Sequence, residues 1–364
     1  MQAGIIGLPN AGKSTIFNAL TTAHAAVANY PFCTIEPNTG FVSVPDENLV
    51  PLSKIYGSEK ITNASIRVVD VAGLVEGASR GEGLGNKFLG HIREVDVIVH
   101  VVRCFHDENV SHSADVIDPV NDVGIVNTEL ILADLEVLHK KREKYHSAAR
   151  TGDLHARNVV EVLDFLTGEL NEGRIPFLPG AEITSGPGKK DPQLFKELNL
   201  LSLKPVLYIS NLGEASDDLL LYEKLKENIK EGEVLKIYGK IENELAELNE
   251  EERDAYRKEM GLPPAGLNDF ILRCYRLLNL ITFYTINENE ARAWSIEKDS
   301  RVIEAAGKIH TDMQKGFIKT EVINCAEILA TGSIHRAREE GKLRIEGRDY
   351  RVKDRDVIQI KFAV

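Results

Sequence analysis

The chain has 364 residues, 43% hydrophobic and 27% charged, which is typical of a globular protein long enough for two or three domains. Its net charge of −12 disfavours broad, non-specific binding to nucleic acid. The charge is uneven, because residues 281–364 carry 15 Lys and Arg against 14 Asp and Glu, and a local RNA contact there is not excluded.

No run of about 18 uncharged apolar residues is present, and the N-terminus passes directly into a glycine-rich motif, so we expect a cytoplasmic protein. The four cysteines are far apart and form no CxxC pair. This spacing argues against a zinc site and a disulfide framework, and we expect buried or bystander thiols.

The first motif is GLPNAGKS at residues 7–14, which matches the P-loop pattern between a strand-like run at residues 3–8 and a helix-like stretch. Its glycines let backbone N–H groups turn toward phosphates, and a helix N-terminus adds positive dipole. Lys13 would reach the β- and γ-phosphates, and Ser14 would offer a hydroxyl to Mg²⁺. The residues expected to contact nucleotide here are Asn10, Ala11, Gly12, Lys13, Ser14 and Thr15.

Two later segments supply the expected metal and γ-phosphate groups. A strand-like run ends in Asp70-x-x-Gly73, where Asp70 suits the water shell of a metal ion and the Gly73 amide can sense a γ-phosphate. Thr34, in NYPFCTIEPNTG, is the natural second hydroxyl ligand for Mg²⁺. The glycine-rich stretch at residues 73–86 is typical of segments that order and disorder with the phosphate state.

A helical segment interrupts the strand pattern. Residues 124–150 place apolar side chains at three-to-four spacing, which predicts an amphipathic helix, and a second helical stretch covers residues 155–173. We expect an antiparallel hairpin, followed by a loop at residues 175–192. Strand-like runs return at residues 204–212 and 234–241, so the hairpin is predicted to be inserted in the nucleotide-binding domain.

The C-terminal part of the chain has two further patterns. The acidic run at residues 242–261 predicts a helix with a solvated face. From about residue 281, short alternating strands surround one helical segment at residues 300–313, which predicts a small α+β module with one open sheet face.

Four segments together, GLPNAGKSTIFNAL, NYPFCTIEPNTG, DVAGLVEGASRGEGLGNKFLGHIREVD and VVRCF, resemble the YchF-type Obg-like ATPases of the TRAFAC P-loop NTPases. The resemblance extends over the whole chain, to the ending GRDYRVKDRDVIQIKF. It implies an α/β fold: a P-loop G-domain with a mostly parallel sheet, an inserted α-helical coiled-coil hairpin, and a C-terminal α+β TGS (ubiquitin-like) domain. The expected boundaries are residues 1–122 with 203–280, residues 123–202, and residues 281–364.

The same resemblance implies a function. Members hydrolyse ATP in preference to GTP with Mg²⁺, associate with ribosomes and are linked to translation and stress responses. We expect the ribosomal contact, to RNA or protein, to involve the TGS and helical domains, and we expect a monomer.

By position in the family motifs, Ser14 and Thr34 would be Mg²⁺ ligands and Asp70 would act through water. Leu74 occupies the place of the water-orienting glutamine of Ras-like switches, so hydrolysis should be slow or should recruit another group. Asn10 either coordinates a K⁺ ion, as in potassium-activated relatives, or only shapes the loop.

A histidine is a candidate for the missing catalytic group. His112 lies in a predicted loop after the strand VVRC, on the side where strand C-termini face nucleotide. A neutral imidazole could position water there, and the alternative is an ordinary surface histidine.

The base-recognition segment is Asn211-Leu212-Gly213-Glu214, where a guanine-specific switch has Asn-Lys-x-Asp. The extra methylene of Glu214 moves the carboxylate away from guanine N1–H and N2. Leu212 would meet the base with an apolar side chain and a backbone carbonyl, and Asn211 would meet N7 and the 6-amino group. The segment predicts a preference for ATP.

Two other functions remain open. One is a P-loop kinase, which needs an acceptor pocket and leaves the Asp70-x-x-Gly73 motif and the helical arm without a purpose. The other is a binding module in which nucleotide is a structural ligand, and Leu74 is compatible with it. Phosphate release with and without ribosomes and K⁺ separates these hypotheses.

Overall fold

The computed structural model describes residues 1–23, 38–71, 73, 84–107, 116–175, 192–263 and 266–363. The chain divides into two compact units, Met1–Ala19 with Val68–Leu262 and Leu20–Arg67 with Pro263–Val364. The three-part division expected from the sequence stays a prediction. Among the described helices, none combines the length and apolarity needed to cross a membrane.

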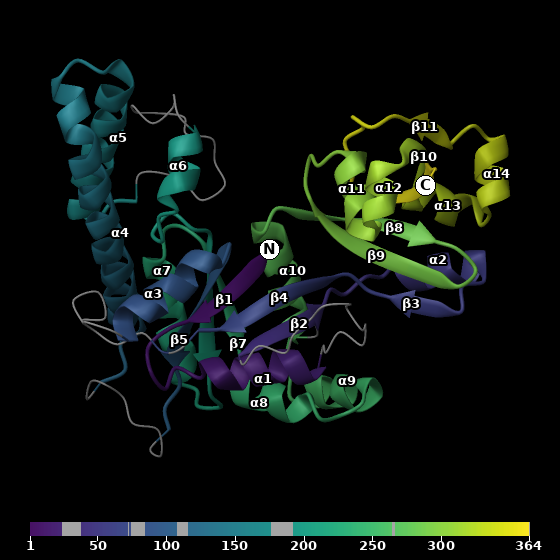
Figure 1. The fold of residues 1–364 in the computed structure, drawn as a ribbon. Helices are drawn as coiled ribbons and strands as arrows, with labels where there is room; N and C mark the ends of the chain where they lie inside the picture. The colour runs from purple at the N-terminus through teal and green to yellow at the C-terminus, as the bar shows by residue number, and fades with distance from the viewer. Residues whose placement is uncertain are drawn as a thin grey trace. The chain divides into compact units, whose positions relative to one another are not determined.

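The first sheet has six strands in the order β2-β4-β1-β5-β6-β7 (Figure 1). Their bounds are β1 Gln2–Ile6, β2 Thr39–Ser43, β4 Ser65–Asp70, β5 Val97–Cys104, β6 Val206–Leu212 and β7 Glu233–Ile237. The pairs β1/β5, β5/β6 and β6/β7 are parallel, which confirms the predicted α/β fold. Every residue of β5 is buried, as expected of a central strand covered on both faces. The carboxyl ends of these parallel strands therefore meet at one edge.

In the part of the chain that the structure describes, eight helices begin within the first unit. They are α1 Lys13–Ala23, α3 Leu84–Glu94, α4 Pro119–Arg150, α5 Leu154–Asn171, α6 Pro192–Leu198, α7 Asp218–Asn228, α8 Gly239–Leu245 and α9 Glu250–Glu259. Side chains of α3 and α4, among them Ile92 and Leu130, share one buried cluster with Ile6 of β1 and Ile98 of β5. The start of the long arm is thus part of the core of the nucleotide-binding fold.

Helices α4 and α5 lie side by side as the predicted hairpin (Figure 1). Leu138 of α4 packs with Leu163 and Leu166 of α5 in a buried cluster. Helix α4 begins at Pro119, five residues before the predicted start, because Asp118 accepts hydrogen bonds from the first free backbone amides and proline suits the first helical position.

Two predictions after the hairpin are wrong in detail. The strand expected over residues 234–241 ends at Ile237, and a helix begins at Gly239. The acidic run forms two helices rather than one, and Glu242 is buried in an ion pair with Arg257 instead of being solvated. Asn249 then starts α9 with a capping box that also uses Glu252.

The second unit contains the other six-stranded sheet, in the order β11-β10-β12-β8-β9-β3. Its strands are β3 Lys60–Thr62, β8 Leu280–Ile286, β9 Glu290–Glu297, β10 Phe317–Asn324, β11 Arg344–Glu346 and β12 Asp356–Phe362. Its helices are α2 Leu49–Tyr56, α10 Gly266–Leu277, α11 Val302–Ile309, α12 Thr311–Lys315, α13 Cys325–Thr331 and α14 Ile334–Glu339. The α+β character of the C-terminal part is confirmed, but the helical segment expected at residues 300–313 is broken at His310, which has extended backbone.

Three cysteines, Cys104, Cys274 and Cys325, are buried free thiols, as expected. Burial raises the pKa of each, so they are poor nucleophiles. The fourth, Cys33, lies outside the described residues.

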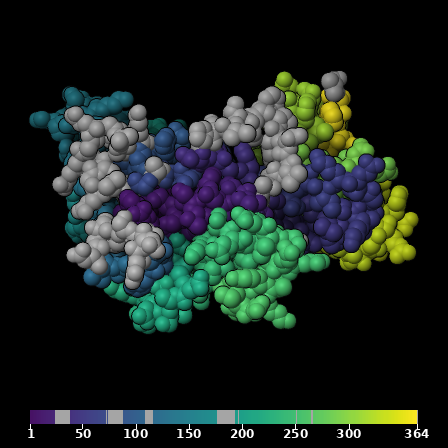
Figure 2. All heavy atoms as spheres, turned by 90° about the horizontal axis from the view of Figure 1, so that it is seen from below, coloured from purple at the N-terminus to yellow at the C-terminus, as the bar shows by residue number. Residues whose placement is uncertain are grey.

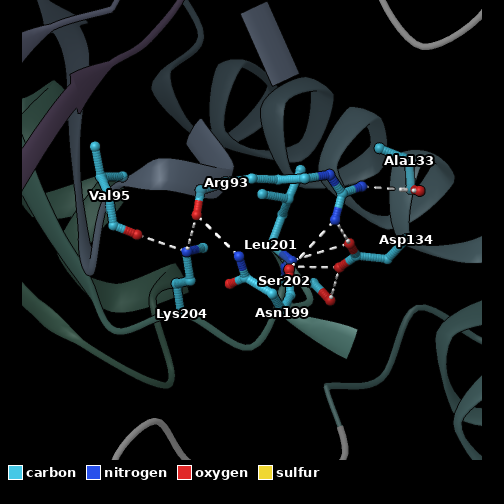
Figure 3. A network of polar contacts seen from close by, with 8 residues as sticks. All are labelled: Arg93, Val95, Ala133, Asp134, Asn199, Leu201, Ser202 and Lys204. Atoms are coloured by element: carbon cyan, nitrogen blue, oxygen red, sulfur yellow. Dashed lines mark hydrogen bonds and ion pairs between the residues drawn. The ribbon is translucent and has the colours of Figure 1, made fainter. Parts of the chain in front are cut away.

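A buried polar network joins the end of α3, the middle of α4 and the segment before β6 (Figure 3). The Asp134 carboxylate, fully buried on α4, accepts hydrogen bonds from Leu201 N at 2.9 Å, Ser202 N at 2.8 Å and Ser202 Oγ at 2.7 Å. Arg93 of α3 approaches it at 3.9 Å and donates to the carbonyls of Asn199 and Ala133.

The backbone at the end of α3 is held as well. Lys204 Nζ donates to the carbonyls of Arg93 and Val95, and Asn199 Nδ2 donates to the carbonyl of Arg93. Burial raises the pKa of Asp134 more than its hydrogen-bond donors and Arg93 lower it, so burying the charged carboxylate costs free energy. Its donors are buried as well, and without the carboxylate they would lack an acceptor.

We expect Asp134→Ala to lower the free energy of unfolding of the first unit by about 3–5 kcal/mol, because it leaves buried donors and the Arg93 charge without their acceptor. The measurement is a urea unfolding curve followed by far-UV circular dichroism, to which the long helices α4 and α5 of the first unit contribute, since the one tryptophan, Trp294, lies in the second unit. Asp164→Ala is the matched control, since Asp164 forms an exposed pair with Arg142 and should change the same quantity by less than about 1 kcal/mol. Equal effects of the two variants would contradict the role given to the network.

Candidate nucleotide-binding site

The P-loop begins where β1 ends, and its shape depends on close contacts inside the protein. A Cβ on Gly7, which has φ 149°, would lie 2.3 Å from the carbonyl oxygen of Val101 on β5. A Cβ on Gly12, at φ 90°, would lie 2.1 Å from Asn211 Nδ2. Asn10 is left-handed at φ 61°, a conformation that asparagine tolerates better than most residues. This conformation is one structural reason for an asparagine at position 10, and the K⁺ role of Asn10 stays a prediction.

Lys13 is the buried cation of the loop, with 8% of its surface exposed. Its Nζ donates to the carbonyl of Leu8 at 2.8 Å, so the side chain curls over the loop that it belongs to. Burial lowers the pKa of Lys13, and the charge of Asp70 opposes this shift. The protein compensates the buried positive charge of Lys13 only in part, so an anion bound at the loop would be stabilised by this charge.

The end of β4 supplies the facing acid. Ser14 Oγ donates to Asp70 Oδ2 at 2.9 Å, while the buried Oδ1 has no hydrogen-bond partner among the described residues. Burial raises the pKa of Asp70, against the effects of the Ser14 hydrogen bond and the Lys13 charge. A hydroxyl beside a carboxylate with an unused oxygen is a donor set that suits Mg²⁺ and its water shell.

Gly73 lies over the same centre, because a Cβ built on it would come 3.1 Å from Lys13 Nζ. The structure thus brings together four residues that the sequence assigned to phosphate and metal: Lys13, Ser14, Asp70 and Gly73. Three other candidates, Thr34, Leu74 and His112, lie outside the described residues.

The side chain of Asn211, at 5% exposure, fastens the P-loop to two other segments. Its Nδ2 donates to the carbonyl of Ala11 at 2.9 Å, and its Oδ1 accepts from Gly239 N at 3.0 Å at the start of α8. A Cβ on Gly239 would also meet Ile16 of α1 at 3.2 Å. Figure 2 shows the purple N-terminal residues next to the green segment that includes α8. One free hydrogen on Nδ2 remains for a base.

In the rest of the base segment, Leu212 is buried, Gly213 is partly exposed and Glu214 is exposed. Leu212 is the last residue of β6 and its side chain, 2% exposed, packs with Val102 and Tyr222 in a core cluster. The apolar base contact expected of Leu212 is therefore wrong for its side chain, and its backbone carbonyl is the group left for a base. Glu214 is exposed to solvent.

Sequence reasoning missed Asp218, the first residue of α7, which is 1% exposed. Its Oδ2 accepts from Gly213 N at 3.1 Å, and its Oδ1 accepts from His106 N at 3.2 Å. A polar residue opening a helix just after the base segment was the available signal, but such residues usually serve only the helix end.

Comparisons with known proteins cover the chain from end to end. The family model YchF-GTPase_C, described as a protein of unknown function (DUF933), matches residues 280–363, and the model MMR_HSR1, described as a 50S ribosome-binding GTPase, matches residues 2–140. A Bacillus subtilis (strain 168) protein named Ribosome-binding ATPase YchF is 42% identical over 373 residues, with 100% of both chains covered. The chain belongs to the YchF family.

Two further YchF proteins match this chain over almost its whole length. The Haemophilus influenzae Ribosome-binding ATPase YchF is 43% identical over 368 residues, covering 100% of this chain and 99% of that protein. The structure of the Schizosaccharomyces pombe YchF GTPase superposes with a TM-score of 0.86 and 31% identity, covering 99% and 97% of the two chains. The YchF names differ in the nucleotide, ATPase for the bacterial proteins and GTPase for the yeast one, so the base must be argued from the site.

We expect Asp70→Asn to lower Mg²⁺-dependent hydrolysis by about 100-fold, equivalent to about 2.7 kcal/mol, and to stabilise the chain at pH 7 without nucleotide or Mg²⁺. Folding raises the pKa of Asp70 above 3.8, so the folded state binds more protons than the unfolded state between the two pKa values. The unfolding free energy therefore falls as pH rises through this interval.

Thermal unfolding at pH 7 and at pH 4 measures the stability effect, and the gain of Asp70→Asn should shrink at the lower pH. Asp254→Asn, exposed on α9, controls for the loss of one negative charge. A lower unfolding temperature for Asp70→Asn at pH 7 would count against the assignment of Asp70 as a desolvated ligand.

Proposed function

We propose that this YchF chain is a nucleotide-dependent switch that binds ATP in preference to GTP, hydrolyses it slowly with Mg²⁺, and works in association with the ribosome. The observation that carries the proposal is the build of the base segment, in which Asn211 is anchored, Leu212 is turned into the core and Glu214 is exposed. The ribosomal part rests on the names of the bacterial relatives and on the description of the matching N-terminal family model.

The base preference follows from what the segment can offer. A guanine reader accepts two hydrogen bonds from N1–H and N2 with a short carboxylate held close to the base. Glu214 is one methylene longer and solvated, so it supplies no fixed acceptor pair for guanine. The backbone carbonyl of Leu212 can accept from the adenine 6-amino group, and the free hydrogen of Asn211 Nδ2 can reach N7.

We propose Mg²⁺ as the cofactor, held by Ser14 and, through water, by Asp70. The unpartnered Oδ1 of Asp70 and the adjacent Ser14 hydroxyl support this fit. When bound, Mg²⁺ neutralises charge that develops on the transferred phosphoryl group. Lys13 is released from the Leu8 carbonyl to bind phosphate oxygens. Gly73, on which a Cβ would lie 3.1 Å from Lys13 Nζ, is the neighbour whose amide would respond to the same oxygens.

Slow turnover is part of the proposal because Leu74 stands where related switches carry a glutamine, and an apolar side chain cannot hold the attacking water. Thr34 as second hydroxyl ligand, His112 as water-positioning group and Asn10 as K⁺ ligand remain hypotheses. The left-handed backbone of Asn10 is equally compatible with the alternative that this residue only shapes the loop.

We expect the chain to bind ATP at least about tenfold more tightly than GTP, a difference of about 1.4 kcal/mol. Fluorescence titration or calorimetry with Mg²⁺ measures both dissociation constants. Glu214→Asp should reduce the preference because it shortens the carboxylate toward the guanine-reading length, whereas Glu227→Asp, exposed on α7, should leave it unchanged. Equal or tighter binding of GTP by the unmodified chain would overturn the ATP assignment.

We also expect ribosomes to raise the rate of phosphate release from ATP and the chain to co-sediment with them. The assay compares ATP with and without ribosomes, and K⁺ with Na⁺, so that it also tests the Asn10 hypothesis. Lys13→Ala should abolish release, because the cation that binds the β- and γ-phosphates is lost. Absence of turnover under every condition would leave a binding module, and transfer to an added metabolite would favour a kinase.

A further inference from the structure

A buried carboxylate ties together two loops that follow neighbouring strands of the nucleotide-binding sheet. Asp218 receives Gly213 N from the loop after β6 and His106 N from the loop after β5. Strands β5 and β6 are parallel neighbours, with Cys104 paired to Leu212 at their ends. Both loops therefore lie at the carboxyl edge of the sheet, where folds of this class bind their ligands.

The contact is close on every side. A Cβ on Gly213 would lie 2.7 Å from Asp218 Oδ2 and 3.2 Å from Phe105 Cβ. Only glycine fits between the carboxylate and the neighbouring loop, so the base segment follows one path here. Glu214, one position on, is exposed and holds nothing in place.

The first two residues after β5, Phe105 and His106, are held by side-chain contacts. The Arg103 guanidinium stacks on the Phe105 ring at 4.7 Å, and its Nε donates to the Phe105 carbonyl at 3.2 Å. His106 Nδ1 lies 2.8 Å from Asp218 Oδ1. Because an ionised carboxylate only accepts, Nδ1 carries the hydrogen in this contact. The two oxygens of Asp218 thus accept from three donors, which are His106 N, His106 Nδ1 and Gly213 N.

We propose that Asp218 is the positioning residue for base recognition. By holding the Gly213 amide it fixes the path of Asn211 to Glu214, and so it sets the position of the Leu212 carbonyl that adenine must meet. Asn211 anchors the same segment on the P-loop side. This inference rests on the proposed ATP preference.

The role makes base and phosphate binding separable. None of the hydrogen bonds of Asp218 described above involves the P-loop, Lys13 or Asp70. Loss of the carboxylate should therefore weaken recognition of the base while the phosphate site stays intact. A merely structural role would weaken both together.

The test is Asp218→Asn in the full chain, with dissociation constants measured for Mg-ATP, Mg-GTP and inorganic tripolyphosphate. Asparagine keeps one acceptor oxygen but turns an amide toward a donor, so we expect ATP binding to weaken about tenfold. The ratio of GTP to ATP dissociation constants should approach 1, and tripolyphosphate binding should change less than about twofold.

Two further variants complete the experiment. Asp217→Asn removes the adjacent exposed charge, which has no helix-capping hydrogen bond, and should leave all three constants unchanged. His106→Ala removes one support of Asp218 from a half-exposed position, and should weaken ATP binding about threefold without affecting tripolyphosphate. It serves as the test if Asp218→Asn does not fold.

The outcomes separate the two proposals. If the unmodified chain does not prefer ATP, the proposed function fails and this inference fails with it. If it prefers ATP and Asp218→Asn keeps that preference, the role of Asp218 is wrong and the proposed function stands. A parallel loss of ATP and tripolyphosphate binding in Asp218→Asn also overturns the positioning role.

Discussion

The nucleotide-binding fold depends on the side-chain amide of Asn211, which links the P-loop to α8. Its two polar atoms bond to the P-loop and to the first residue of α8, and Cβ atoms on Gly12 and Gly239 would come within 2.1 Å and 2.7 Å of them. The glycine in the P-loop is therefore required by a protein side chain as well as by phosphate. Asn211 thus links the P-loop to the end of β6, where the base segment begins.

Near this link, Lys13 is buried and Asp70 is partly buried, and burial disfavours the charged form of each. Lys13 and Asp70 have pKa shifts in opposite directions, each toward the neutral form, and only partial compensation from one another. Such groups reduce the stability of the folded chain and increase what a bound anion and cation can contribute. The arrangement links ligand affinity directly to folding stability, because a ligand that binds only the folded chain stabilises it.

The sequence was sufficient to predict that Lys13, Ser14, Asp70 and Gly73 lie together, because the P-loop and Asp70-x-x-Gly73 are local patterns with one structural context. The direction of Leu212 was also available, since successive strand residues face opposite sides, and an Asn211 directed at the P-loop requires Leu212 to face away. Asp118 and Pro119 also predict the observed start of α4, because aspartate is favoured at the N-cap and proline at the first helical position. The roles of Asp134 and Asp218 could not be deduced, because their partners are as much as 68 and 112 residues away in the chain.

The Asp134 network also has a mechanical consequence. From Asp134 to the end of α4 at Arg150 the helix rises by about 24 Å, so a tilt of about 10° at the network displaces the far end by about 4 Å. Arg93, in the last turn of α3, contacts α4 at this network: it approaches Asp134 and donates to the Ala133 carbonyl. Any tilt of α4 about this network is therefore magnified with distance along the arm.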